Sequence, residues 1–229
     1  MNRPSWTQVL SVSIPLSTQT ARPASRASRH VKRWLDLALA LVLAFALAPL
    51  MLLLAALVRG SDGGPALFRQ DRIGRGGRLF RCWKFRTMAC NAEQALADYI
   101  AGNPEAAREW RECQKLTHDP RVTALGAFLR KSSLDELPQL YNILVGEMSF
   151  VGPRPIVAAE VERYGDAFQQ CFSVPPGLTG LWQISGRSDC SYAHRVALDS
   201  RYASEWDLLL DAEIMLKTVP AVLLQKGSR

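Results

Sequence analysis

A long apolar run near the start of the chain dominates the hydropathy pattern. From Leu37 to Val58, 22 consecutive residues carry neither a charge nor a polar side chain. A straight helix of that length measures about 33 Å, which is enough to cross a bilayer core of about 30 Å. The pattern therefore predicts that this segment inserts into a membrane. A cleavable signal peptide is a weaker interpretation, because the polar region before the run is too long and the run continues past the small residues at 46–48.

Two features of the apolar run argue against a simple crossing. Pro49 lies in its middle, where a proline removes a helical hydrogen bond and bends the helix. Basic residues flank the run on both sides, at Arg26, Arg29, Lys32 and Arg33 before it and at Arg59, Arg69, Arg72, Arg75 and Arg78 after it. Since basic flanks stay in the cytoplasm, we expect a re-entrant helix over residues 34–58, broken at Pro49, that enters and leaves the membrane on one side. A spanning helix with a proline kink is the alternative.

Residues 59–229 form one predicted domain of short elements. Alternating positions around the glycine-rich turn at 74–77 predict a hairpin over residues 66–86. Amphipathic spacing predicts further helices, namely two between 92 and 116 that are broken at 102–104, and others over 125–131, about 135–145 and 203–225. The sequence has no strand–helix alternation long enough for a doubly wound sheet. We therefore expect an α+β fold, with a monotopic membrane helix and a cytosolic domain of short helices and a small hairpin.

The basic charge of the chain is concentrated at its N-terminus. The sequence has 28 lysines and arginines against 21 acidic residues, and residues 1–33 hold six of the basic residues and no acidic ones. The rest of the chain is nearly balanced, so we predict a flexible basic arm over 1–33 rather than a nucleic-acid-binding surface. Five cysteines without a Cys-x-x-Cys pair argue against a structural zinc site and fit a reducing, cytosolic compartment.

The candidate chemistry centres on the adjacent acids Asp135 and Glu136. The sequence contains no Walker A loop, dinucleotide-binding glycine motif, zinc-protease motif or nucleophile elbow. The acid pair follows Arg130 and Lys131 and lies at the start of a predicted helix, where a carboxylate can attack phosphorus or bind a divalent cation. A structural interpretation is equally open, because Ser133 and Glu136 have the spacing of a helix capping box.

Isolated cations and one tryptophan form the second group of candidates. Lys84 and Arg86 share a face of the second predicted strand, where they either bind an anion or lipid headgroup or form a solvated surface. Arg154 lies between two prolines, and so rigid a loop favours a bidentate phosphate contact. Trp182 follows a glycine-rich loop and either stacks on a nucleobase or packs in the core.

Five motifs, in this order along the chain, carry a family resemblance: Lys84–Met88, Asp119–Thr123, Ser133–Leu140, Gly152–Pro155 and Pro176–Arg187. Together they resemble the bacterial sugar transferases, the monotopic phosphoglycosyl transferases that begin polysaccharide assembly on polyprenyl phosphate. The resemblance extends over roughly residues 32–227 and is strongest to the short galactose phosphotransferases that initiate exopolysaccharide synthesis. One departure is Ala48, where the family often has serine before the proline, so another group must support the bend.

The resemblance implies a mechanism and a metal. Asp135 would attack the β-phosphate of a UDP-sugar, releasing UMP and forming a phosphosugar–aspartyl intermediate. Undecaprenyl phosphate would then accept the phosphosugar. Glu136 would act as a base or metal partner, and Mg²⁺ held by Asp135 and Glu136 would neutralise the diphosphate.

The resemblance also implies binding residues, partners and a location. Lys84, Arg130 and Arg154 match positions expected to hold phosphates, and Arg86 and Trp182 complete the expected substrate-binding set. The expected location is the bacterial inner membrane, with the active site on the cytoplasmic face. Expected partners are membrane lipids and downstream glycosyltransferases; no nucleic acid is expected, and a homodimer is left open.

Two other functions are consistent with the residues alone. A non-catalytic, membrane-tethered adaptor would bind anionic lipid through its basic residues and use Asp135 and Glu136 as a helix cap. A lipid-diphosphate hydrolase would use the same acids with Mg²⁺ and release inorganic phosphate from polyprenyl substrates. Only the transferase predicts that Asp135→Asn abolishes sugar transfer from a UDP-sugar.

Overall fold

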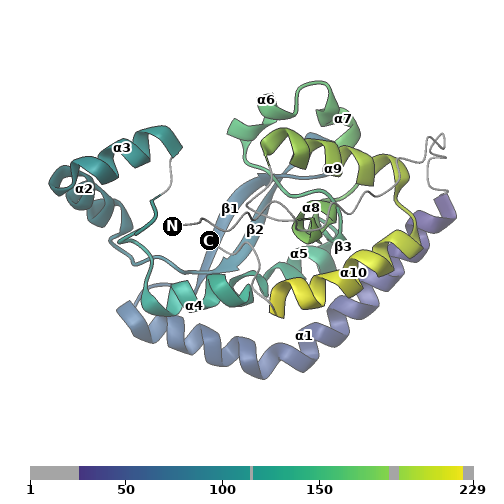
Figure 1. Cartoon of the computed structure of the whole chain (residues 1–229). Coiled ribbons are helices and arrows are strands. Elements are labelled where there is room, and N and C mark those ends of the chain that lie inside the picture. Colours follow the sequence, from purple (N-terminus) through teal and green to yellow (C-terminus); the bar gives the residue numbers. More distant parts are fainter. Residues whose placement is uncertain (1–25, 114–115, 186–190, 224–229) are drawn as a thin grey trace, which may run out of the picture.

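The computed structural model describes residues 26–113, 116–185 and 191–223, and its longest element is the apolar helix α1 (Arg26–Asp62). The 37 residues of α1 correspond to a length of about 55 Å. Residues 26–33, which the charge pattern assigns to the arm, form the first turns of this helix. The predicted break at Pro49 is wrong, because the helix continues through the proline. Figure 1 shows instead that α1 bends near its middle, which is the usual response of a long helix to an internal proline.

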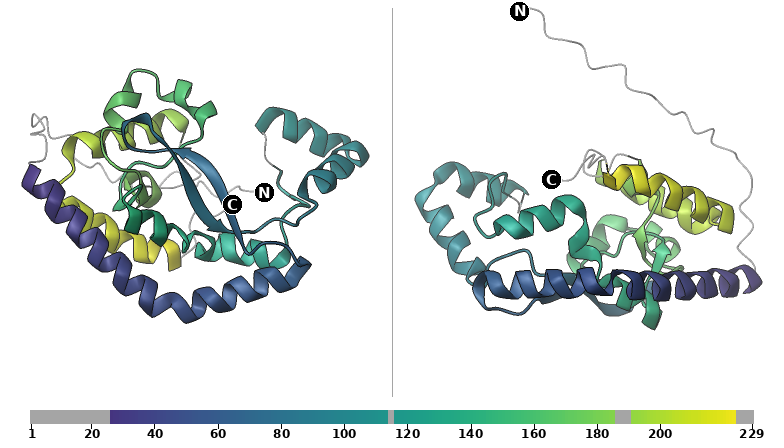
Figure 2. Two further views of the ribbon diagram at one scale, coloured as in Figure 1. Left: turned by 180° about the vertical axis from the view of Figure 1, so that it is seen from behind. Right: turned by 90° about the horizontal axis from the view of Figure 1, so that it is seen from below.

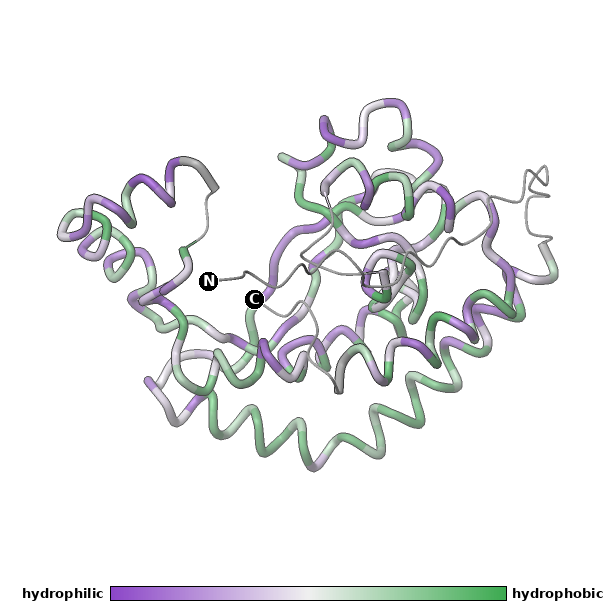
Figure 3. The backbone as a smooth tube through the Cα atoms, in the orientation of Figure 1, coloured by the Kyte–Doolittle hydropathy of each residue, from purple (hydrophilic) through white to green (hydrophobic). Residues whose placement is uncertain are grey.

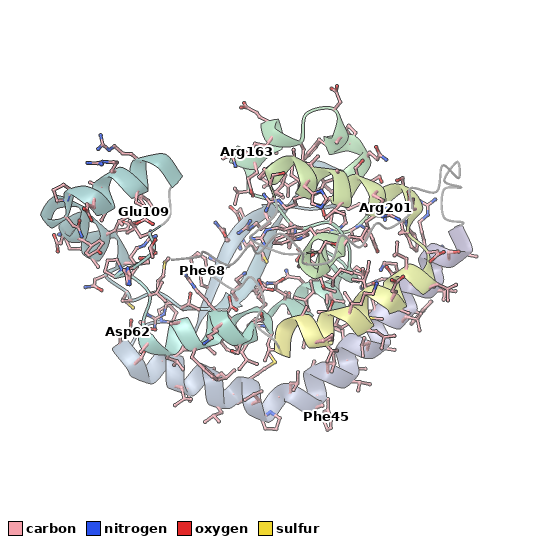
Figure 4. All side chains as sticks on the ribbon, in the orientation of Figure 1. Phe45, Asp62, Phe68, Glu109, Arg163 and Arg201 are labelled. Atoms are coloured by element: carbon pink, nitrogen blue, oxygen red, sulfur yellow. The ribbon has the colours of Figure 1, made fainter. Side chains whose placement is uncertain are left out.

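The convex side of α1 exposes apolar side chains. Within the part of the chain that the structure describes, α1 is the one helix long and apolar enough to cross a membrane, and only 11% of its most apolar window is buried. Phe45 is 85% exposed and Leu52 is 72% exposed. Figure 3 shows the apolar stretch along the outer edge of the molecule, and Figure 4 places Phe45 on the convex side of the bend. So large an apolar surface is typical of a segment covered by lipid.

The predicted hairpin is confirmed. Strands β1 (Leu67–Ile73) and β2 (Leu79–Phe85) pair antiparallel with Leu67 opposite Phe85, and the turn η1 (Arg75–Gly77) joins them. Gly76 and Gly77 have φ of 67° and 76°, a left-handed conformation that glycine adopts without strain. The hairpin therefore supplies one long, twisted ribbon across the middle of the molecule (Figure 1).

The helices after the hairpin follow the predicted order. Helices α2 (Ala92–Gly102) and α3 (Pro104–Cys113) are separated at Asn103 as expected, and they stand apart from the rest of the molecule in Figures 1 and 2. Helix α4 (Ala124–Ser132) confirms the next prediction. The helix expected over about 135–145 is divided by Pro138 into the short turn η2 (Leu134–Glu136) and helix α5 (Gln139–Val145).

The C-terminal half combines short elements with two longer helices. Strands β3 (Ser149–Val151) and β4 (Gly177–Thr179) form a two-residue parallel pairing. The single helix expected over 203–225 is wrong, because the chain forms two helices that are separated at Trp206 and Asp207. The remaining helices and turns are η3 (Ala158–Glu160), α6 (Val161–Tyr164), α7 (Ala167–Cys171), α8 (Leu181–Ile184), α9 (Tyr192–Glu205) and α10 (Leu208–Leu223). Mixed helices and two small sheets confirm the expected α+β class.

Both ends of α1 are tied to this one domain. At the start, Lys32 Nζ donates to Asp211 Oδ2 of α10 over 2.6 Å. At the end, the guanidinium of Arg86 donates to the carboxylate of Asp62, which Figure 4 places at the opposite end of the helix. One side of the C-terminal half of α1 also packs against β2 and α4, in a core cluster of Leu54, Val58, Phe85 and Leu129. The helix therefore lies along the domain over its length rather than projecting from it.

Candidate active site

The acid pair lies on a tight turn against the hairpin. Ser133 ends α4 with a φ of 58°, the one left-handed non-glycine conformation among the described residues, and η2 follows directly. The turn brings the acids to β2, where Lys84 Nζ is 2.6 Å from Glu136 Oε1 and 3.8 Å from Asp135 Oδ2. Asp135 is only 8% exposed. The structure thus brings together the three predicted residues Asp135, Glu136 and Lys84.

The capping-box interpretation of these acids is wrong. The Ser133 side chain makes no capping hydrogen bond to η2, and its left-handed backbone differs from the extended conformation of an N-cap residue. The Glu136 carboxylate accepts from Lys84 instead. The ion pair to Lys84 of β2 therefore fixes the position of the acids, and hydrogen bonds that cap a helix do not.

The Asp135 carboxyl has a strongly raised pKa. Burial raises the pKa of its carboxyl to about 6, opposed by the charge of Lys84, and the Glu136 carboxylate raises it further. The charge of the Arg130 guanidinium lowers the pKa of Asp135. At neutral pH the carboxyl is therefore ionised but poorly solvated, a state that favours nucleophilic attack or binding of a cation.

Arg130 is held toward the acids by Thr87. Arg130 Nε donates to Thr87 Oγ1 over 2.9 Å. Helix α4 reaches this position because Gly126 has no side chain, since a Cβ there would lie 2.0 Å from the Thr87 carbonyl oxygen. Thr123 Oγ1 caps the same helix by accepting from the Gly126 amide. A guanidinium thus stands beside the acid pair in a fixed orientation.

Arg154 is carried by a loop that packs main chain against main chain. A Cβ on Gly152 would lie 2.4 Å from the Pro175 carbonyl oxygen, and one on Gly177 would lie 2.1 Å from the Gly152 nitrogen. The Gly177 amide donates to the Pro153 carbonyl over 2.8 Å. This packing, together with the two prolines around Arg154, gives the loop the rigidity expected from its sequence.

Trp182 lies beneath two arginines. The Arg154 and Arg195 guanidinium carbons are 5.1 and 5.5 Å from the centre of the Trp182 ring. Trp182 is 9% exposed and belongs to the main core cluster. The indole therefore supports the arginines, and its stacking on a nucleobase stays a prediction.

Within the described part of the chain, buried nitrogen atoms without a hydrogen-bond partner cluster around Trp182. Three buried nitrogens have no hydrogen-bond partner among the described residues: Arg154 Nε, Trp182 Nε1 and Arg195 Nε. Buried donors are normally paired, and exceptions concentrate where a ligand completes the hydrogen bonds. The sequence signalled Arg154 through its prolines, but it gave no signal for Arg195, which lies on a helix that the spacing did not predict.

A second arginine that the sequence analysis did not assign to the site, Arg72, lies between the acid pair and the residues around Trp182. Arg72 of β1 lies 3.9 Å from Glu160, which also pairs with Arg195 over 3.2 Å. Burial lowers the pKa of Arg72, and the neighbouring charge of Arg154 lowers it further, while Glu136 acts in the opposite direction. We call Arg72, Arg154 and Arg195 the arginine cluster. Two of its members, Arg72 and Arg195, pair with Glu160, and the charge of Glu136 acts on Arg72, so the cluster adjoins the acid pair.

A buried acid supports the arginine cluster from behind. Asp199 of α9 is 1% exposed and accepts hydrogen bonds from the Tyr164 hydroxyl, over 2.8 Å, and from the main-chain amide of Arg154. Burial raises the pKa of the Asp199 carboxyl to about 7, although both hydrogen bonds lower it. Asp199 thus fixes the Arg154 loop to α9.

Arg86 is not brought to the acid pair. Its guanidinium is taken up by Asp62 and by the carbonyl oxygen of Val58, and its Nε donates to the Pro65 carbonyl over 2.7 Å. These contacts tie the hairpin to the end of α1. A substrate contact from Arg86 stays a prediction, and Arg187, at the end of the fifth motif, lies outside the described residues.

The acid pair could hold a magnesium ion whose remaining ligands are water and substrate phosphates. Within the described ranges there is no group of three or more histidine, cysteine or acidic residues that could hold a metal alone. Mg²⁺ commonly binds one or two carboxylates and completes its octahedron with water and substrate phosphates. Asp135 and Glu136 are the two carboxylates that could hold such an ion, and a cation beside them would offset the cost of burying the charge of Asp135.

Comparison with known proteins agrees with this geometry. The profile of the family described as bacterial sugar transferase matches residues 27–225. The exopolysaccharide production protein ExoY of Sinorhizobium fredii is 51% identical over 215 residues, which cover 94% of each chain. An undecaprenyl-phosphate galactose phosphotransferase of Salmonella typhimurium is 47% identical over 90% of this chain and 43% of its own. A UDP-glucose:undecaprenyl-phosphate glucose-1-phosphate transferase of Caulobacter vibrioides is 40% identical over 84% of this chain and 69% of its own. The protein is therefore a transferase that belongs to the bacterial sugar transferase family.

Proposed function

We propose that this protein transfers a sugar-1-phosphate, of the galactose or glucose type, from a UDP-sugar to undecaprenyl phosphate with release of UMP. This transfer would be the initiating step of exopolysaccharide synthesis. The names of two of the relatives described above include undecaprenyl phosphate, and the name of the third includes exopolysaccharide production. The observation that carries the proposal is the buried Asp135 carboxylate, held beside Lys84 and Arg130.

In the first step, Asp135 acts as the nucleophile. One carboxylate oxygen forms a bond to the β-phosphorus of the UDP-sugar, and the bond from that phosphorus to the bridging oxygen breaks. UMP leaves with the electron pair, and a phosphosugar–aspartyl intermediate remains. A carboxylate is a weak nucleophile in water, so the desolvation that raises the Asp135 pKa to about 6 is the feature that favours attack.

In the second step, the phosphate of undecaprenyl phosphate attacks the same phosphorus. The bond to Asp135 breaks, and the carboxylate is regenerated without a net change of protons on the chain. Lys84 stabilises charge on the acid pair in both steps, and the 2.6 Å contact to Glu136 keeps its ammonium in place. Glu136 is thus a positioning partner of Lys84 as well as a candidate base or metal ligand.

The arginine cluster is suited to hold the diphosphate of the donor. Three guanidinium groups face two carboxylates, Glu160 and Asp199, and burial raises the pKa of Asp199 to about 7. The cluster therefore carries excess positive charge next to the acids. The unpaired nitrogens of Arg154, Arg195 and Trp182 offer hydrogen bonds that phosphate oxygens accept well. When bound by Asp135 and Glu136, Mg²⁺ would supply charge neutralisation for the diphosphate.

The position of α1 supports a re-entrant insertion. A helix that crosses the membrane carries its two ends to opposite sides, whereas both ends of α1 are bound to the same domain through Lys32–Asp211 and Asp62–Arg86. Figure 2 shows that the convex side of the bend in α1 faces away from that domain, and Figure 4 places the exposed Phe45 on this side. This arrangement favours a domain on the cytoplasmic face of the inner membrane, where UDP-sugars and the phosphate group of the acceptor both reach the acid pair.

Nucleotide release tests the proposed reaction. Purified protein is incubated with Mg²⁺, undecaprenyl phosphate and a panel of UDP-sugars, and the released nucleotide is quantified. Release of UMP with one donor, absent in Asp135→Asn, is the expected result and also identifies the sugar. Release of UDP would indicate ordinary glycosyl transfer, and release of inorganic phosphate from polyprenyl substrates would indicate the hydrolase; either would refute the proposal.

A further inference from the structure

A cavity of about 550 Å³ lies at the start of α1, away from the acid pair. Its wall is formed by the first turns of α1, the tip of the hairpin, the loop at 173–175 and the end of α9. None of the acid pair, Lys84 or the arginine cluster lines it. The acid pair instead adjoins β2 and α4, which pack on the other half of α1, around Leu54 and Val58. The molecule thus has two separate sites near opposite ends of its membrane helix.

The cavity is basic, and within the part of the chain that the structure describes Arg33 and Arg75 form no ion pair. Arg29, Lys32, Arg33 and Arg75 line it, against the single carboxylate of Asp36. Lys32 is paired with Asp211, which does not line the cavity. Arg33 donates to the Leu144 carbonyl over 2.9 Å, and Arg75 donates to the Ser173 carbonyl over 3.2 Å. Because carbonyl groups carry no net charge, these contacts orient the two guanidinium groups without cancelling their charge.

Another part of the lining is apolar and includes a tryptophan. Met148, Val174, Pro175 and Trp206 contribute carbon surface beside the cations. A ligand that is complementary to both the basic and the apolar part of the lining has an anionic group joined to an apolar body. A small free anion would leave the apolar surface uncovered.

The cavity also lies at the level where lipid headgroups are found. Asp36, its last lining residue on α1, directly precedes the apolar run that begins at Leu37. Trp34, two residues before Asp36, is 72% exposed. Tryptophan and basic residues at the end of an apolar helix are typical of the membrane–water interface, and basic pockets there bind anionic headgroups.

We propose that this cavity binds the phosphate headgroup of an anionic glycerophospholipid, with the apolar lining covering the start of its acyl chains. The site is independent of the sugar-phosphate chemistry and would link the start of α1 to the lipid composition of the membrane. Arg75 is the most informative residue to change, because it is exposed on the hairpin turn and its substitution leaves the core intact.

The experiment measures lipid binding by the full-length chain in neutral detergent. Phosphatidylglycerol, phosphatidylcholine, undecaprenyl phosphate or sodium phosphate is titrated, and native mass spectrometry and thermal unfolding report binding. Arg75→Gln is compared with Arg78→Gln, which removes the same charge three residues away from an exposed side chain that does not line the cavity. Arg33→Gln provides a second variant from a different element.

We expect phosphatidylglycerol to bind and stabilise the wild type and Arg78→Gln, with affinity about tenfold lower in Arg75→Gln and in Arg33→Gln, as expected for loss of one charge-assisted contact. Phosphatidylcholine and sodium phosphate should have no such effect. Equal phosphatidylglycerol affinity in Arg75→Gln and Arg78→Gln would overturn the proposal. So would an equal response to phosphate alone, which would identify a soluble anion, or Arg75-dependent binding confined to undecaprenyl phosphate, which would identify an acceptor site.

Discussion

Replacing Asp135 by asparagine is expected to make the protein more stable while it abolishes transfer. Burial raises the pKa of this carboxyl from 3.8 to about 6, so folding at neutral pH holds an ionised group in an environment that disfavours the charge. At about 1.4 kcal/mol per pKa unit, the shift corresponds to about 3 kcal/mol of lost stability above pH 6. Asparagine removes the charge but leaves amide donors facing Lys84 and Arg130, so the expected net gain is about 1–3 kcal/mol.

The sign of the pH dependence follows from the direction of the shift. Below pH 3.8 the carboxyl is protonated in both the folded and the unfolded chain, and it contributes nothing. As the pH rises toward 6, the unfolded chain loses its proton first, so the wild type loses stability over this window and stays level above it. The advantage of Asp135→Asn should therefore be largest at pH 8 and smaller by about 1.4 kcal/mol at pH 5.

Thermal unfolding in detergent at pH 8 and at pH 5 measures this difference, with nucleotide release measured on the same samples. One kcal/mol corresponds to about 2–4 °C for a chain of this size, so the unfolding midpoint should rise by several degrees at pH 8. Asp71→Asn, which removes an exposed carboxylate from β1, is the matched control and should change neither the midpoint nor the activity.

A loss of stability in Asp135→Asn at both pH values would refute the reasoning. That outcome is expected if the acid pair were a structural cap, as in the adaptor interpretation. Retained transfer by the variant would remove Asp135 as the nucleophile. A stability gain combined with lost transfer is the signature of a group strained for function, which a purely structural residue does not produce.

Three further predictions address the cation, the anion-binding loop and the topology. Lys84→Ala should shift the acidic limb of the pH profile of kcat/KM to higher pH than in the wild type, because Lys84 lowers the Asp135 pKa, and Lys84→Arg should restore most of the shift. Arg154→Lys should raise KM for the UDP-sugar at least about tenfold, because lysine offers no bidentate contact, whereas Arg81→Lys on the exposed face of β2 should leave KM unchanged. Tags at Met1 and Arg229 should both be protected from protease in sealed right-side-out vesicles, and digestion of the N-terminal tag alone would restore a spanning helix.

The site was predictable where neighbouring residues restrict a side chain. Arg154 stood out because two prolines flank it, and Asp135 and Glu136 stood out as adjacent acids after two cations. The spacing of Ser133 and Glu136 led to the wrong prediction of a capping box. The same spacing occurs in the left-handed turn that is found here, in which Glu136 pairs with Lys84 instead. Arg72 and Arg195 gave no signal, since an arginine on a strand or helix surface looks alike whether it faces solvent or a buried cluster.

The sequence by itself determined the apolar helix, the hairpin, the helices α2 to α4 and the adjacent acids Asp135 and Glu136, because each depends on contacts within a few residues of the chain. Only the tertiary structure decided which cations meet those acids. Lys84 reaches Glu136 across 52 positions, Arg86 is drawn instead to Asp62 at the end of α1, and Arg195 meets Arg154 over one indole. It also decided that α1 bends without breaking, since both of its ends are bound to the same domain. Such long-range pairings depend on how whole elements pack, and no local pattern in the chain encodes them.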